Sequence, residues 1–128
     1  MRLLLDTHVF LWYITADTRL PAAFRQVIEE PANEVFLSVA SIWEAVIKNG
    51  LGKLPLPAPP AEYLPRQRAL HRIASVPIEE EALAHLATLA PLHRDPFDRI
   101  LVAQAIQHDM TMATVDDAVK QYSIRFLE

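Results

Sequence analysis

The sequence predicts an α/β fold, with a short and mostly parallel sheet of four to five strands flanked by helices. Two observations lead to this prediction. Short stretches that are apolar throughout alternate with longer stretches in which apolar residues recur at helical spacing. Strands that are apolar on both faces belong to sheets covered on both faces, and such sheets are usually parallel. The 128 residues suffice for a single domain, residues 1–128, with its own hydrophobic core.

The alternating pattern places each element. Strands are expected in short, mainly apolar segments at residues 2–5, 34–38, 73–78 and 111–115, with residues 123–127 as a candidate edge strand. Helices are expected at residues 7–16, 21–30, 39–48, 61–72, 79–90, 96–108 and 117–122.

Residues known for beginning or ending helices support these boundaries. Pro21 can open a helix, because proline is tolerated in the first turn, and Asn49 with Gly50 can close one. Pro65 should kink or split the helix that contains it. The proline-rich residues 51–60 are expected to form an ordered surface connection, since too little chain flanks them for two domains.

The composition narrows the class of protein. There is no cysteine, which excludes disulfides and thiolate metal sites and favours a reducing compartment. No apolar run approaches the length of a membrane span. Asp6 interrupts the apolar stretch that a secretion signal would need. We therefore expect a cytoplasmic protein with no membrane partner.

The net charge of −4 is unevenly distributed. Residues 48–72 carry five basic side chains and one acidic one, whereas residues 1–47 and 73–128 are both acidic overall. A basic segment of this kind can follow a phosphate backbone. An ordinary solvated helix face explains the same charges.

Two acidic residues directly follow expected strands, and a third lies on a helix beside them. Asp6 follows the first strand and Asp116 the fourth. In parallel sheets, ligands bind beyond the carboxyl ends of the strands. Each of the two also has a local explanation, Asp6 as a helix cap and Asp116 as a turn residue, with Asp117 as the cap of the next helix.

On the helix over residues 39–48, Glu44 is expected at the margin of an apolar arc, either reaching along the core boundary toward the sheet or extending to solvent.

The segment PLHRDPFDRILVAQA places two aspartates at the start of one helix. Asp95 followed by Pro96 is typical of a helix N-cap with proline in the first turn. At about 100° per residue, Asp98 falls in the middle of the stripe that contains Leu101 and Val102. A carboxylate there must be met by a positive or donating group, so we expect Asp98 to be functional, the alternative being a capping acid.

Carboxylates gathered at one edge of a sheet repel one another unless a cation neutralises them. Mg²⁺ or Mn²⁺ is the expected cofactor, because these ions prefer oxygen ligands and act together with substrate phosphates. Such a site hydrolyses phosphodiesters by lowering the pKa of bound water.

Four segments, LLLDTHVFLW, SVASIWEAVIKNGLGKL, HRDPFDRILVAQA and TMATVDDAVKQY, resemble the PIN-domain ribonucleases in order and spacing, specifically the VapC-type toxins of bacterial toxin–antitoxin modules. The resemblance implies a three-layer PIN-like sandwich and a Mg²⁺- or Mn²⁺-dependent endoribonuclease that cuts structured RNA (transfer or ribosomal) to inhibit translation. It places the catalytic and metal-binding acids at Asp6, Glu44, Asp98 and Asp116. It also implies supporting hydroxyl groups at Thr7, Ser41 and Thr114.

The resemblance further implies a homodimer and a cognate antitoxin that neutralises the enzyme. The early helices are where antitoxin contact is expected, with core packing as the alternative for most of their large residues, Phe10, Trp12, Tyr13, Phe24 and Val27. Candidate RNA contacts are the basic residues Lys48, Lys53, Arg94 and Arg99. The five histidines do not have the spacing of metal ligands, although His93 and Arg99 flank the two aspartates.

Two other functions remain open. An aspartyl-phosphate phosphotransfer enzyme also places an acid after a strand, but His8 stands where the phosphatases of that class have a second aspartate. A non-catalytic PIN-like interaction module would have no use for four acids, which without a metal would only lower its stability.

Overall fold

The structure is a computed structural model that describes residues 1–128 in full. One parallel sheet has the strand order β3-β2-β1-β4, with β1 at Arg2–Leu5, β2 at Glu34–Ser38, β3 at Ala74–Val76 and β4 at Thr111–Ala113. The helices are α1 (Thr7–Ile14), α2 (Ala22–Glu29), α3 (Val39–Gly50), α4 (Pro60–Leu70), α5 (Glu80–Thr88) and α6 (Pro96–Gln107). None of them is long and apolar enough to cross a membrane. The predicted α/β class and the short parallel sheet are confirmed.

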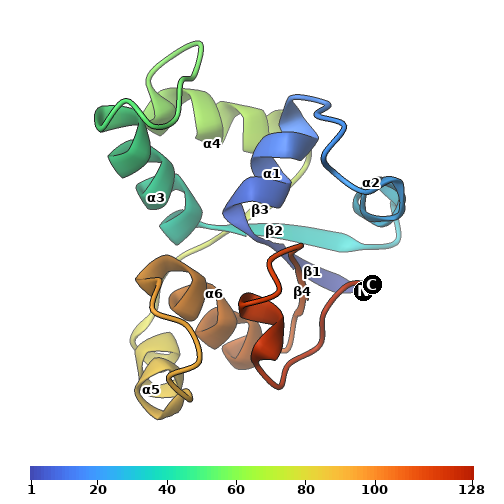
Figure 1. Cartoon of the computed structure of the whole chain (residues 1–128). Coiled ribbons are helices and arrows are strands. Elements are labelled where there is room, and N and C mark those ends of the chain that lie inside the picture. The colour runs from blue at the N-terminus through green and yellow to red at the C-terminus, as the bar shows by residue number, and fades with distance from the viewer.

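The helices cover both faces of the sheet, which gives three layers (Figure 1). Helices α1 to α4 lie on one side, and α5 and α6 on the other, together with the short 3₁₀ turn η1 (Val119–Gln121). Strand β1 runs through the middle and feeds both cores: Leu3 and Leu5 pack into one cluster and Leu4 into the other. This two-sided burial explains why the strand is apolar at every inner position.

Several boundaries differ from the sequence prediction for local reasons. Strand β3 ends at Val76 because Pro77 has no N–H to continue the ladder. Helix α4 continues through Pro65 as one helix, so of the predicted kink or split, the split does not occur. The C-terminal edge strand is reduced to a single parallel bridge between Met112 and Phe126.

The apolar arc predicted for the helix over residues 39–48 is wrong. The buried residues of α3 are small or polar: Ala40, Ser41, Glu44 and Ala45. Most of the bulky residues lie outward, with Trp43 56% exposed, whereas Ile42 is partly buried and packs against the core. The fully buried positions of α3 hold only short side chains and one carboxylate, that of Glu44.

The strand register sets the position of the candidate site. Leu5 pairs with Leu37 on one side and with Ala113 on the other. The residues that follow, Asp6 and Thr114, therefore emerge side by side, and the N–H of Asp6 donates to the carbonyl of Ala113 at 3.0 Å. This carboxyl edge of the sheet is where α1 and α3 both begin.

Candidate functional site

Asp6 joins the ends of two strands. It is the N-cap of α1, and its Oδ1 accepts a hydrogen bond from the backbone N–H of Val9 at 2.7 Å. Its other oxygen accepts from the hydroxyl of Thr114, which follows β4. Burial of Asp6 raises the pKa of its carboxyl group, although both hydrogen bonds oppose the shift. The capping role expected for Asp6 is thus present, and it holds the carboxylate at the sheet edge.

Glu44 is held by Thr7 on α1 and by Lys48 on its own helix, α3. The side chain is almost fully buried, and Oε1 accepts from the Thr7 hydroxyl at 2.7 Å. That hydroxyl also lies 2.9 Å from the hydroxyl of Ser41. Because a carboxylate can only accept, the single hydrogen of Thr7 goes to Glu44, and Ser41 donates to Thr7. The other oxygen, Oε2, pairs with the ammonium group of Lys48 at 2.5 Å, and this bond raises the pKa of Lys48.

Asp98 is the third residue of α6 and is largely buried, with 18% of its side chain exposed. Burial, together with the charges of Asp95 and Glu44, raises the pKa of Asp98 to about 7, against the opposing effect of His93. The expected position of Asp98 on the buried stripe is confirmed, since Leu101 and Val102 are fully buried.

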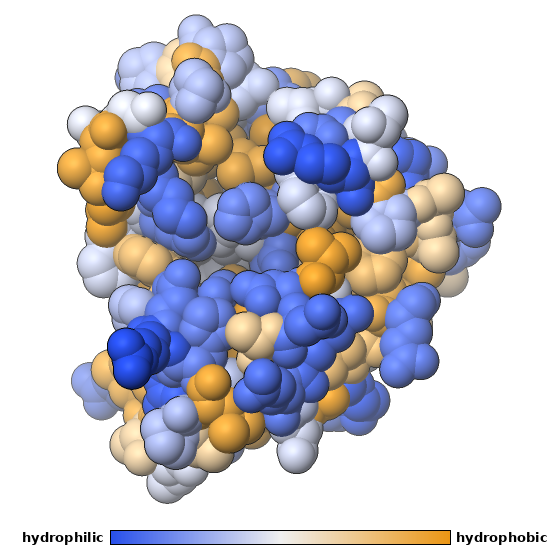
Figure 2. All heavy atoms as spheres, in the orientation of Figure 1, coloured by the Kyte–Doolittle hydropathy of each residue, from blue (hydrophilic) through white to orange (hydrophobic).

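Asp98 and Asp116 meet at His93. The Nε2 atom of His93 lies 3.1 Å from Oδ2 of Asp98 and 3.8 Å from Oδ2 of Asp116. One atom from each of these three side chains lies within 4.8 Å of the others. Hydrophilic side chains gather across this face of the molecule, between α1 and α3 above and α6 below (Figure 2).

The four predicted acids are therefore not equivalent. Asp98 and Asp116 lie together, and Asp6 and Glu44 are near enough for their charges to raise the pKa of Asp98. Oxygen donors of this kind fit Mg²⁺ or Mn²⁺, which bind through few carboxylates and retain several waters. The two carboxylates at His93 have no cationic Lys or Arg partner, so a divalent ion suits the charge of the site.

The sequence predicted the helix-capping role of Asp95 correctly, but not that of Asp117. Asp95 caps α6, with Oδ1 accepting from the N–H groups of Phe97 at 2.9 Å and Asp98 at 3.4 Å. Asp116, in contrast, makes the local turn itself, accepting from the N–H of Ala118 at 2.9 Å. Asp117 was predicted to cap the next helix and does not, because the turn is made one residue earlier.

The four candidate RNA contacts lie in different environments. Lys48 is paired with Glu44, whereas Lys53 and Arg94 are exposed. The guanidinium of Arg99 donates to the carbonyl of Ala90 and to the hydroxyl of Tyr122, both at 2.9 Å. It therefore holds the chain before α6 and makes no ion pair with Asp98.

Sequence reasoning did not include His93 among the site residues. Its spacing from the other histidines carried no information, and the contact depends on how residues 89–95 fold back before α6. The usable signal was its position two residues before the N-cap Asp95, which returns its side chain to the first turn of the helix.

Comparison with known proteins gives the family. The model of the PIN domain family matches residues 3–125. Ribonuclease VapC22 of Mycobacterium tuberculosis is 28% identical over 120 residues, 93% of this chain and 90% of that protein. Ribonuclease VapC16 of the same organism is 34% identical over 61 residues, 48% of this chain but only 43% of that protein.

A solved structure shares the fold. VapBC2 from Rickettsia felis, bound to a DNA fragment from its promoter, aligns with a TM-score of 0.71 at 16% identity, covering 100% of this chain and 98% of that chain. With the family model covering nearly every residue from β1 to the C-terminal segment, this chain belongs to the PIN domain family.

Proposed function

We propose that this protein is a divalent-metal-dependent endoribonuclease that hydrolyses phosphodiester bonds of structured RNA, as the toxin of a toxin–antitoxin pair. The observation that carries the proposal is the pairing of Asp98 with Asp116 at the carboxyl edge of the sheet, without a cationic Lys or Arg partner. Two relatives named as VapC ribonucleases support the substrate class.

Asp98 and Asp116 would hold the ion directly, with Asp6 and Glu44 completing the acidic site. When bound, a Mg²⁺ or Mn²⁺ ion lowers the pKa of coordinated water and neutralises charge on the phosphodiester. The protein side chains then have positioning roles. Thr7 and Ser41 orient Glu44, and Thr114 orients Asp6 through hydrogen bonds.

The basic side chains around the site would contact the RNA backbone. Lys53 and Arg94 are exposed and free to do so, and Lys48 would have to share its ammonium with Glu44. Arg99 is the weakest of the candidates, because its guanidinium already has three intramolecular acceptors.

An antitoxin and a second copy of the chain are the proposed protein partners. Of the large residues on the early helices, Phe10 and Phe24 are buried in the core and cannot contact a partner. Trp12, Tyr13 and Val27 are only partly buried and are the ones left for antitoxin contact. Homodimerisation follows from the family resemblance, and the outward side chains of α3 give it an apolar surface.

The alternative of an aspartyl-phosphate enzyme is disfavoured by the surroundings of Asp6. Asp6 as a residue is 5% exposed, and each of its carboxylate oxygens already accepts a hydrogen bond. A nucleophilic aspartate needs an accessible oxygen, so no phosphoenzyme should form at Asp6.

The test is RNA cleavage by partner-free protein with Mg²⁺ or Mn²⁺. Wild type should cleave total RNA only with added metal, and Asp98→Asn should abolish cleavage. Asp95→Asn is the matched control in the same helical turn, and it should retain both activity and stability, because asparagine caps a helix about as well as aspartate. Cleavage that survives chelation of metal, or survives Asp98→Asn, would refute the mechanism.

A further inference from the structure

We propose that His93 acts at the acid site as a hydrogen-bond donor to a phosphate group of the substrate, and not as a third metal ligand. The inference rests on the proposed nuclease function and adds one residue to it. It follows from the position of the imidazole ring, from the hydrogen bond at its other nitrogen and from the way its backbone is held.

The ring of His93 reaches the two acids that lie together. Its Nε2 is 3.1 Å from Asp98 and 3.8 Å from Asp116, and 19% of the side chain is exposed. Part of the His93 side chain is therefore exposed to solvent beside the two carboxylates. Geometry alone is compatible with either a ligand or a donor, because all three atoms lie within 4.8 Å of one another.

The hydrogen bond at Nδ1 decides between these roles. The backbone N–H of Asp95 donates to Nδ1 of His93 at 3.1 Å. A ring nitrogen that accepts carries no hydrogen, so the hydrogen of the neutral ring is on Nε2, the atom beside the carboxylates. Metal-binding histidines have the opposite arrangement, in which the ring nitrogen away from the metal donates its hydrogen to an acceptor. To bind a metal, His93 would have to abandon the N–H of Asp95, the residue that caps α6.

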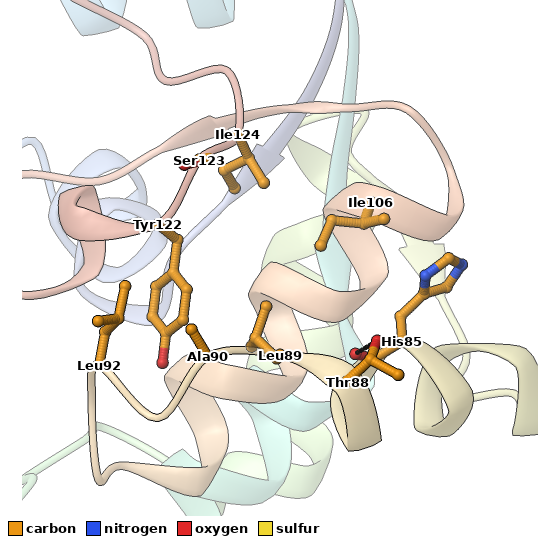
Figure 3. Close-up of a pocket in the computed structure, with 9 residues that line it drawn as sticks. All are labelled: His85, Thr88, Leu89, Ala90, Leu92, Ile106, Tyr122, Ser123 and Ile124. Atoms are coloured by element: carbon orange, nitrogen blue, oxygen red, sulfur yellow. Dashed lines mark hydrogen bonds between the residues drawn. The ribbon is translucent and has the colours of Figure 1, made fainter.

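The backbone of His93 is fixed by the C-terminal segment. Its N–H donates to the hydroxyl of Tyr122 at 3.1 Å, and the same hydroxyl accepts from Arg99 at 2.9 Å. The Tyr122 ring extends alongside Leu92 and Ala90, with its hydroxyl toward this loop, at one side of a cavity of about 330 Å³ (Figure 3). These contacts set the position of His93 before any substrate arrives. A donor that is positioned in advance is the effective kind.

A phosphate is the acceptor that suits a donor in this place. In the absence of metal, two carboxylates repel an anion. When a divalent ion neutralises them, a phosphate oxygen can approach, and the N–H of His93 is available to it. The donor keeps its hydrogen throughout, so the role requires no proton transfer.

The test compares His93→Ala and His93→Gln with wild type, using His85→Ala on α5 as a control histidine outside the site. Mn²⁺ affinity, measured by calorimetry, should stay within about threefold of wild type in every variant, since His93 is not a ligand. Single-turnover RNA cleavage at saturating Mn²⁺ should fall roughly 100-fold in His93→Ala, the loss typical of a removed electrostatic donor. His93→Gln, which restores an N–H donor, should recover at least tenfold of that loss, and His85→Ala should cleave as wild type does.

Two results would overturn the inference. A fall of tenfold or more in Mn²⁺ affinity in both His93 variants would make His93 a ligand, and wild-type cleavage by His93→Ala would remove it from the reaction. If wild type itself does not cleave RNA, the proposed function fails but His93 can still be tested. The affinity of the Mn²⁺-loaded protein for inorganic phosphate should then fall in His93→Ala and return in His93→Gln. Equal phosphate affinity in all three proteins would refute the role, and thermal melting of each variant identifies any loss that unfolding causes.

Discussion

Replacing Asp98 by asparagine should stabilise the metal-free protein, and the gain should grow as the pH rises. Asp98 is 18% exposed, and burial together with the nearby charges of Asp95 and Glu44 raises its pKa from 3.8 to about 7. Asparagine has nearly the same shape and no charge, so it removes the repulsion among the acids while keeping the packing.

The direction and size follow from the two pKa values. The unfolded chain releases the Asp98 proton near pH 3.8, and the folded protein releases it near pH 7. Between these values the folded state holds more protons, so the free energy of unfolding of wild type decreases as the pH rises and levels off above pH 7. A shift of this size corresponds to at most about 4 kcal/mol, and solvent screening of the partly exposed carboxylate reduces the expectation to about 2 kcal/mol.

Urea denaturation in EDTA gives the measurement. Wild type and Asp98→Asn are compared at pH 4.5 and at pH 8, and the difference in their free energies of unfolding should be about 2 kcal/mol larger at the higher pH. Comparing two pH values removes contributions of the substitution that do not depend on titration. If the difference between the two proteins is the same at both pH values, or smaller at pH 8 than at pH 4.5, the pKa of Asp98 is not raised in the folded protein.

Addition of metal should make wild type more stable than Asp98→Asn. A ligand present at about 100 times its dissociation constant stabilises the folded state by about 2.7 kcal/mol. Wild type should gain this from Mn²⁺ at pH 8, and Asp98→Asn should gain much less. A variant that gains as much as wild type would separate Asp98 from metal binding.

Three further substitutions test the packing around the site. Tyr122→Phe should lower the free energy of unfolding by about 1–2 kcal/mol, because the hydroxyl accepts from both His93 and Arg99, and it should lower the cleavage rate more than a matched surface change would. Phe10→Ala should be destabilising by about 3–5 kcal/mol, whereas Trp43→Ala should lose only about 1 kcal/mol, since Trp43 is largely exposed and packs edge-on against Phe97. Urea denaturation checks all three, and a Trp43 loss as large as that of Phe10 would contradict the orientation of α3.

The sequence predicted well the features that depend on neighbouring residues within one helix or strand. The N-cap at Asp95 depends on the residue before a proline, and the inward position of Asp98 depends only on helix periodicity. The strand end that places Asp6 follows from an uninterrupted apolar run, whereas β4 ends at Ala113, before the predicted end at residue 115, so Asp116 does not directly follow the strand. Each of these inferences uses residues within one element, where the physical rule acts over a few positions.

Inferences that depended on a partner element failed. Helical periodicity identified two faces of α3 but assumed that the bulkier one is buried, whereas the close approach of α1 through Thr7 requires small residues and Glu44 there. The contact of His93 depends on Tyr122, which lies 29 residues further along the chain. No pattern within residues 89–95 specifies that anchor.

The distribution of hydrogen bonds indicates where the charge of the site is unbalanced. Asp6 has two donors, and Glu44 has a hydroxyl and an ammonium group. Asp116 has one backbone donor, the N–H of Ala118, and otherwise shares with Asp98 only the ring of His93, whose hydrogen bond at Nδ1 leaves a single hydrogen on the side facing them. The negative charge that the protein does not neutralise is therefore concentrated on this pair. An ion of charge +2 would balance it, and for that reason we expect metal binding to depend most steeply on these two residues and less on Asp6 and Glu44.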